Sequence, residues 1–218
     1  MTLVVRTFPT GPLQANCYVA YNANSKRALV IDPGDKCPAV LECIKKEGLQ
    51  VDQIVLTHAH FDHVFGVGYL QAELEKLGTR PKSYVHQSDK EHWAANRMFA
   101  TFFGLTVPPD YPGEPDVLYT EVDMFDLGDE LVFKVLHTPG HTPGSSVIYT
   151  LKGEAAFTGD TIFSNSVGRT DFPGGSHAQL CKSIDKIYAT LPRSMTIYPG
   201  HNEEEQLGAA ERAIRACL

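Results

Sequence analysis

The chain has 218 residues, which is long enough for one domain with a sizeable hydrophobic core and no need of disulfide bonds. Hydrophobic residues make up 43% and charged residues 21% of it, which excludes a collagen, a coiled coil and a disordered protein. The 19 basic and 26 acidic residues give a formal net charge of −7, which argues against a nucleic-acid-binding protein.

The N-terminal segment has no charged region followed by an apolar run, so no secretory signal is predicted. No segment approaches the roughly 18 consecutive apolar residues of a membrane span. The five cysteines are scattered, without a C-x-x-C pair, which is typical of a reduced protein without disulfide bonds. We therefore expect a cytoplasmic protein that has no membrane partner.

Apolar runs bounded by Gly, Pro and Asn predict strands over residues 3–8, 16–22, 27–32, 53–56, 82–86, 122–125, 130–136, 145–150, 155–158 and 195–198. Apolar residues at helical spacing predict helices over residues 38–47, 64–77, 88–97 and 203–216, and one that begins at Ser176. Strands outnumber helices and form hairpin-like runs, which favours an αββα sandwich over a doubly wound sheet. A segment rich in Pro and aromatic residues, about 98–119, is predicted to be a loop or lid insert within a single domain over 1–218.

Three histidines and an aspartate crowd into residues 57–63, Thr-His-Ala-His-Phe-Asp-His, between a predicted strand and a predicted helix. His58 and His60 alternate and can share one face, whereas Asp62 and His63 enter a tighter helical turn. A merely polar or pH-sensitive loop is the alternative. Burying three imidazoles without partners is costly, and metal coordination removes that cost. The cluster therefore predicts a site for two neighbouring transition metals.

Three further candidate ligands lie in loops that follow predicted strands. They are His141, Asp160 and His201, each next to Gly or Pro residues that allow a close approach of the backbone. Loops at one edge of a rigid scaffold are a usual place for catalysis, so we expect these side chains to converge on the histidine-rich loop.

These motifs resemble those of the metallo-β-lactamase-fold hydrolases, and most closely the short glyoxalase II-like branch. The matching segments are T-H-A-H-F-D-H at 57–63, T-P-G-H-T at 138–142, T-G-D-T at 158–161, P-G-H at 199–201, G-P-L-Q-A-N-C-Y at 11–18 and V-G-R-T-D-F-P-G-G-S at 167–176. The similarity covers most of the chain, from about residue 11 to residue 201. It implies the metallo-β-lactamase-like fold, in which helices flank two mixed β-sheets.

The resemblance also implies a role for each candidate ligand. One metal would be held by His58, His60 and His141. The other would be held by Asp62, His63 and His201, and Asp160 would bridge the two. The implied cofactors are two divalent transition-metal ions, with zinc favoured and iron or manganese as alternatives. A hydroxide shared by the metals would attack the carbonyl of a thioester, and Asp62 would act as a catalytic residue that orients it.

The implied activity is hydrolysis of hydroxyacyl-thiols such as S-lactoylglutathione, so the expected partner is a small thioester, with a glutathione conjugate as one candidate. The longer family members carry a C-terminal glutathione-binding helical domain, and we expect this chain to lack it because only 17 residues follow His201. Arg169 either binds a substrate carboxylate or forms an internal ion pair with Asp171.

A second reading is a mononuclear iron persulfide dioxygenase, a relative that carries a similar Arg-Thr-Asp motif and oxidises persulfides during sulfide detoxification. In that branch only His58, His141 and Asp160 would bind metal, so the complete second set of ligands favours hydrolysis. A third reading is a non-catalytic metal-binding module. The sequence leaves open the physiological substrate, the native metal and the oligomeric state.

Overall fold

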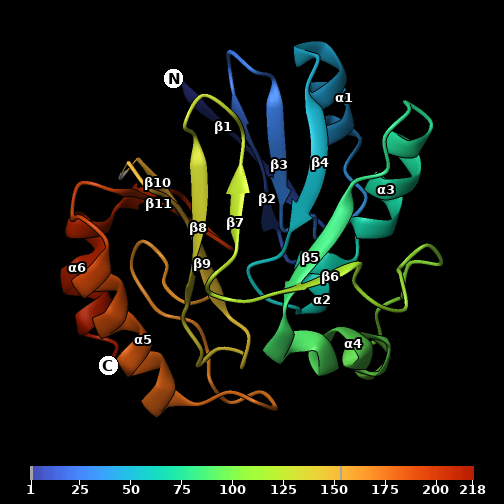
Figure 1. Ribbon diagram of the computed structural model, residues 1–218. Coiled ribbons are helices and arrows are strands. Elements are labelled where there is room, and N and C mark those ends of the chain that lie inside the picture. Colours follow the sequence, from blue (N-terminus) through green and yellow to red (C-terminus); the bar gives the residue numbers. More distant parts are fainter. Residues whose placement is uncertain (1, 153) are drawn as a thin grey trace.

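The computed structural model describes residues 2–152 and 154–218, which form four layers in the order helix, sheet, sheet, helix (Figure 1). The first sheet has the strand order β1-β2-β3-β4-β5-β6 and the second β12-β11-β10-β9-β8-β7. Both sheets contain parallel and antiparallel neighbours. The prediction of an αββα sandwich with two mixed sheets is confirmed.

The strands of the first sheet are β1 (Leu3–Thr10), β2 (Ala15–Asn22), β3 (Arg27–Ile31), β4 (Gln50–Val55), β5 (Lys82–His86) and β6 (Val117–Tyr119). Those of the second are β7 (Met124–Asp126), β8 (Val132–His137), β9 (Ser146–Thr150), β10 (Ala155–Gly159), β11 (Thr196–Pro199) and β12 (Glu205–Gln206). The helices are α1 (Pro38–Glu47), α2 (Phe61–Val64), α3 (Val67–Glu75), α4 (Lys90–Phe102), α5 (His177–Thr190) and α6 (Leu207–Arg215), with a short 3-10 turn η1 (Gln87–Asp89) before α4.

The core has three parts because each sheet is covered on both faces. Tyr18 and Leu29 of the first sheet meet Phe133 and Phe157 of the second in the central layer. The other face of the first sheet packs on α1, α3 and α4, and the other face of the second packs on α5 and α6. This two-sided burial explains the apolar runs: every residue of β2 is buried, with alternate side chains in different core layers.

Four details differ from the predicted elements. The predicted helix 64–77 corresponds to the last residue of α2 and to α3, with a break at residues 65 and 66. The predicted helix 88–97 extends to Phe102, and residues 117–119 pair with β5 as strand β6, so the irregular part of the predicted 98–119 insert is only 103–116. The first residues of the predicted helix 203–216 include β12, which pairs with β11, and α6 starts at Leu207.

The edge strand β6 is attached to the sheet through Asp116. The Asp116 carboxylate accepts hydrogen bonds from the Ser83 backbone N–H and hydroxyl at 2.8 and 2.7 Å, and from the side chains of Gln71 and Arg80. Partial burial alone would raise the pKa of Asp116, but these hydrogen bonds lower it to about 2. The ionised carboxylate therefore stabilises the folded state.

We expect Asp116→Ala to lower the free energy of unfolding at pH 7 by about 2 kcal/mol, as urea denaturation would measure. Because the pKa is lower in the folded chain, this stabilisation is present above the ordinary carboxyl pKa of about 4 and is lost as the pH falls toward 2. The difference between wild type and Asp116→Ala should thus shrink below about pH 4, whereas the exposed Asp52→Ala should change little. A difference that stays constant down to pH 3 would contradict this assignment.

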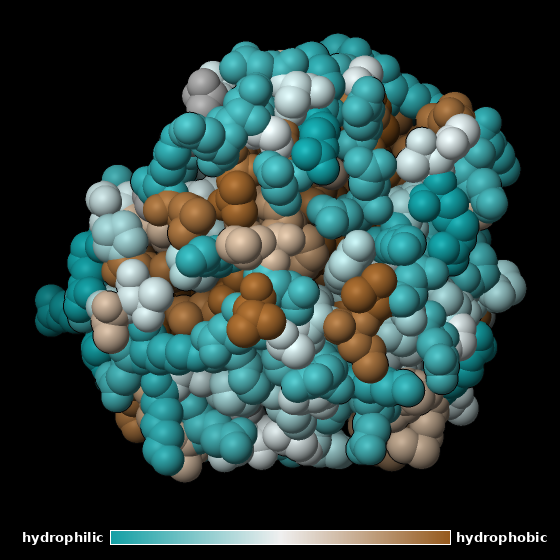
Figure 2. Space-filling view, in the orientation of Figure 1, coloured by the Kyte–Doolittle hydropathy of each residue, from teal (hydrophilic) through white to brown (hydrophobic). Residues whose placement is uncertain are grey.

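Apolar residues gather in a hollow on the face shown in Figure 2, over the region of β6, β7 and β8. Large exposed apolar side chains in this part of the chain include Leu118, Val122 and Met124. Within residues 2–152 and 154–218, no helix is both long enough and apolar enough to cross a membrane.

Candidate metal centre

The histidine-rich loop connects β4 to α2. His58 lies in a bend of the loop and His60 has an extended backbone just before α2, whereas Asp62 and His63 lie in the first turn of α2. The Ser146 N–H donates a hydrogen bond to the Thr57 carbonyl oxygen at 2.9 Å, which joins this loop to the start of β9 in the other sheet. The loop therefore lies where the two sheets meet.

One group of possible ligands consists of His58, His60 and His141, whose ligand atoms all lie within 4.8 Å of one another. His141 reaches the group from the loop after β8. The ring centroids are 4.9 Å apart for His58 and His60, 4.9 Å for His58 and His141, and 4.6 Å for His60 and His141. The Nε2 atoms of His58 and His141 are buried without a hydrogen-bond partner.

A second group consists of Asp62, His63 and His201, again within 4.8 Å of one another. His201 follows β11, and two side chains of β2 hold its loop in place. The Asn16 amide donates to the carbonyl oxygens of Pro199 and Asn202 at 3.0 and 2.7 Å, and the Tyr18 hydroxyl donates to Pro199 O at 2.5 Å.

Asp160 lies between the two groups. Its Oδ2 is 3.6 Å from His141 Nε2 of the first group and 3.6 Å from His201 Nε2 of the second. Its Oδ1 is 3.5 Å from His63 Nε2 and is buried without a hydrogen-bond partner. The structure therefore brings all seven predicted ligands together, with the Asp160 carboxylate between the two groups.

The electrostatics of the centre suit divalent cations. Burial and the neighbouring imidazoles lower the pKa of His58 and of His60 well below the ordinary value, so both rings are neutral and their lone pairs are available. Burial alone would lower the pKa of His63, but Asp62, Asp160 and Asp32 outweigh it and raise that pKa to about 10. The three carboxylates thus favour a positive charge at this position, and a bound metal ion would take the place of the proton on His63.

Burial alone would raise the pKa of Asp62, but His63 and His201 lower it below its ordinary range, so this carboxylate is ionised. Unpartnered buried nitrogen and oxygen atoms, neutral imidazoles and excess negative charge together fit a pair of divalent transition-metal ions. Asp32, His58 and His63 form a third group of possible ligands, and all three are buried.

Asp32 orients two of the ligands, and the sequence did not single it out. Its Oδ2 lies 3.2 Å from His63 Nδ1 and accepts a hydrogen bond from the Thr57 hydroxyl at 2.5 Å, and that hydroxyl is 3.2 Å from His58 Nδ1. A carboxylate on the far nitrogen of a metal-binding histidine fixes the orientation of the ring. The available signal was its place at the end of β3, before Pro33-Gly34, which resembles the place of the other candidate ligands.

We expect Asp32→Asn to weaken metal binding by about 10- to 100-fold while the chain stays folded. An amide cannot hold the His63 ring in the same way, because it offers one acceptor atom instead of two. Competition with a chromophoric chelator would measure the affinity, and Asp52→Asn, an exposed carboxylate in β4, is the matched control. Unchanged affinity in a folded Asp32→Asn protein would contradict the positioning role.

Asp89 connects the histidine-rich loop to the loop that carries His141. Its carboxylate is fully buried and accepts hydrogen bonds from the Ala59 N–H, the Thr142 hydroxyl and the Gly144 N–H at 2.9, 2.8 and 2.5 Å. Burial raises the pKa of Asp89 despite these hydrogen bonds. The sequence indicated only the start of a helix here, since both partner loops are distant in the chain.

A cavity of about 510 Å³ opens above the centre. The residues that line it are Leu13, His60, Phe61, Asp62, Phe103, Leu105, His141, Asp160, Arg169, Phe172 and His201. Phe103 and Leu105 belong to the irregular segment 103–116, so part of the predicted insert borders the centre. The cavity thus combines metal-binding side chains with an apolar wall, which is typical of a small-molecule site.

Of the two predicted arrangements of Arg169, the structure contains the ion pair with Asp171. Its Nε and Nη2 donate to the two carboxylate oxygens of Asp171 at 2.7 and 2.8 Å, and its guanidinium carbon lies 3.7 Å from the ring centroid of Phe172. It also lines the cavity, and its carbonyl oxygen lies 2.8 Å from His141 Nδ1. The ion pair is present, and the substrate-binding role stays a prediction.

The model of the metallo-β-lactamase superfamily matches residues 10–201, a range that contains every predicted ligand. The chain belongs to the metallo-β-lactamase superfamily. The hydroxyacylglutathione hydrolase GloC of Haemophilus influenzae is 30% identical, and the match covers 96% of this chain and 95% of that protein. The predicted relationship to the glyoxalase II-like branch of the superfamily is thereby confirmed.

Two solved structures of the superfamily fold are similar over nearly the whole chain. The B3 metallo-β-lactamase BLEG-1 is 34% identical with a TM-score of 0.81, covering 96% of this chain and 97% of that one. The protein TTHA1623 in a di-iron-bound form is 33% identical with a TM-score of 0.82, covering 96% and 98%. A β-lactamase and a protein that binds two iron ions thus share this fold, and the fold by itself decides neither the activity nor the metal of a chain.

Proposed function

We propose that this chain is a metal-dependent thioester hydrolase of the glyoxalase II-like type, which acts on hydroxyacyl-thiols such as S-lactoylglutathione. The observation that carries the proposal is the position of Asp160 between two complete ligand groups at the floor of an open cavity. The similarity to a hydroxyacylglutathione hydrolase over almost the full length of both chains supports the choice of substrate class.

In this proposal His58, His60 and His141 hold one ion, Asp62, His63 and His201 hold the other, and Asp160 contacts both. Two bound divalent cations would lower the pKa of water and polarise a carbonyl oxygen. Zinc is the favoured ion, with iron or manganese as alternatives, because imidazole and carboxylate ligands accept all three.

Asp62 is the proposed catalytic residue among the ligands. Its carboxylate is ionised, faces the cavity and lies 3.4 Å from His201 Nε2, so one of its oxygens can accept a hydrogen bond from a water molecule and orient it. The leaving thiolate needs little protonation, since the pKa of a thiol is only about 8.5. The site therefore needs no separate acid to complete hydrolysis of a thioester.

The walls of the cavity would bind the rest of the substrate. Phe61, Phe103 and Phe172 form an apolar side, with ring centroids 6.0 and 5.9 Å apart along the row, which would cover the acyl group and exclude water. Asp171 occupies two N–H donors of Arg169, and the remaining ones can bind a carboxylate of the substrate.

Elemental analysis of the purified protein, combined with a hydrolysis assay on S-lactoylglutathione, tests the proposal. We expect about two transition-metal ions per chain and metal-dependent hydrolysis, which a chelator abolishes. One iron per chain with oxygen uptake on a glutathione persulfide would replace the proposal with the dioxygenase reading. Faster hydrolysis of a β-lactam than of the thioester would contradict it too, as would a fully metal-loaded protein that turns over none of these substrates.

A further inference from the structure

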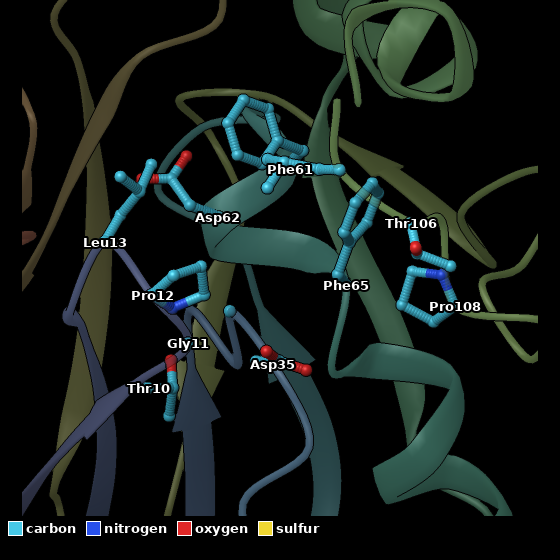
Figure 3. Close-up of a pocket in the computed structure, with 12 residues that line it drawn as sticks. Thr10, Gly11, Pro12, Leu13, Asp35, Phe61, Asp62, Phe65, Thr106 and Pro108 are labelled. Carbon is cyan, nitrogen blue, oxygen red and sulfur yellow. The ribbon is translucent and has the colours of Figure 1, made fainter. Parts of the chain in front are cut away.

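A second cavity, of about 210 Å³, lies beside the one above the metal centre. The two cavities share Leu13, Phe61, Asp62 and Leu105 in their walls, so they adjoin. The other residues that line the second cavity are Thr10, Gly11, Pro12, Gly34, Asp35, Phe65, Thr106 and Pro108 (Figure 3). A substrate that reacts beside Asp62 can therefore extend an arm into this second cavity.

The charge of the second cavity is negative. Among the described residues that line it, the charged side chains are Asp62, which belongs to the metal centre, and Asp35. Figure 3 shows Asp35 at the foot of the cavity, beside Gly11 and well below Asp62. Asp35 Oδ1 accepts the Lys36 backbone N–H at 2.7 Å, but the Lys36 ammonium group pairs with Asp110, 3.8 Å away. The nearest lysine in the sequence therefore leaves the Asp35 charge available to a ligand.

The surroundings of Asp35 are apolar and aromatic. Phe61 and Phe65, whose ring centroids are 5.9 Å apart, line the cavity together with Pro12 and Pro108. Such walls lower the local dielectric constant, which strengthens the attraction between a carboxylate and a cation. Aromatic rings also attract ammonium groups through their faces. A metal ion is disfavoured, because no group of three or more possible metal ligands among the described residues includes Asp35.

We propose that this second cavity is a subsite for an ammonium group of the substrate, and that the Asp35 carboxylate is the residue that binds it. The inference rests on the proposed thioester hydrolase and specifies its substrate further: the thiol arm carries a free amino group. Arg169, which lines only the larger cavity, lies at a separate part of the cleft and suits a carboxylate. The cleft as a whole then matches a zwitterionic, peptide-like thiol.

Two substrates and two variants test the subsite. The substrates are S-lactoylglutathione and its N-acetyl derivative, which lacks the ammonium charge. For wild type we expect kcat/KM to be about tenfold higher for the free amine, which is the effect of one charge-assisted hydrogen bond. Asp35→Asn should lose this preference by losing activity on the free amine alone, and Asp52→Asn should keep it. Equal kcat/KM of wild type for the two substrates would overturn the subsite.

A binding experiment separates this inference from the proposed function. S-methylglutathione and its N-acetyl derivative are unreactive thioethers, and calorimetry would measure their affinity for the metal-loaded protein. We expect wild type to bind the free amine about tenfold more tightly, and Asp35→Asn to bind both alike. Absence of hydrolysis with this binding preference intact would contradict the thioesterase and leave the subsite supported. Equal affinity of wild type for both thioethers, or equal weakening of both by Asp35→Asn, would overturn the subsite.

Discussion

Asp160→Ala is expected to abolish thioester hydrolysis and to reduce the metal content of the purified protein. Asp160 Oδ2 is 3.6 Å from a histidine of each ligand group, so this one substitution removes the carboxylate that both ions would share. Losing several kcal/mol of charge stabilisation at a metal centre corresponds to a decrease of about 10³-fold in kcat/KM. Elemental analysis and steady-state kinetics with S-lactoylglutathione would measure the two effects.

Asp52→Ala is the matched control for Asp160→Ala. It removes an exposed carboxylate from the beginning of β4, whereas the histidine-rich loop follows the end of that strand. The control should keep both its metal and its activity. If Asp160→Ala retains turnover with its metal content verified, the assignment of the bridging carboxylate is wrong, and the proposed hydrolytic centre fails with it.

Gly200→Ala is expected to disrupt the centre without replacing any ligand. A Cβ atom at position 200 would overlap Asp160 Oδ1 and would lie 2.8 Å from His63 Cε1. Neither neighbour can move freely, because Asp32 holds the His63 ring and Asp160 follows the end of β10. We expect the metal affinity and kcat/KM to fall by about 10²-fold, the size of effect that a displacement of about 1 Å produces at an active site.

Gly113→Ala is the control for Gly200→Ala, since a Cβ atom at position 113 would meet no atom within 4 Å. Both variants should show the circular dichroism of wild type, and only Gly200→Ala should lose metal. Full metal occupancy and activity in Gly200→Ala would show that the ligands tolerate a shift, which would contradict the tight packing of His63, Asp160 and Gly200.

The candidate ligands were predictable because their sequence context is local. Each lies in the loop that follows an apolar strand or, for Asp62 and His63, in the helical turn directly after that loop. Three histidines and an aspartate within residues 57–63 have few physical explanations other than metal binding. Asp32 and Asp89 carry no such signal. Their roles come from partners on other elements, such as His63 for Asp32 and Gly144 for Asp89, so burial and hydrogen bonding reveal them only in the folded chain.

Some helix boundaries are likewise set by local sequence, and others are set by contacts with distant segments. Helix α1 begins and ends at the predicted residues, because Pro38 suits a first helical position and Gly48 adopts the left-handed conformation that ends a helix. The break between α2 and α3 is different. The Gly66 N–H donates to the Pro33 carbonyl oxygen at 2.8 Å, and a Cβ atom there would clash with the backbone of Asp35. This contact between distant segments outweighs the helical pattern of residues 64–77.

The sequence by itself therefore determined the layered α/β class, most of the strands and the seven residues of the candidate centre, because apolar periodicity and ligand chemistry are properties of short segments. Only the tertiary structure decided which carboxylates support those ligands, how short edge strands such as β6 and β12 pair, and where the second cavity with Asp35 lies. These features depend on contacts between residues far apart in the chain, and such contacts form only when the two sheets pack together.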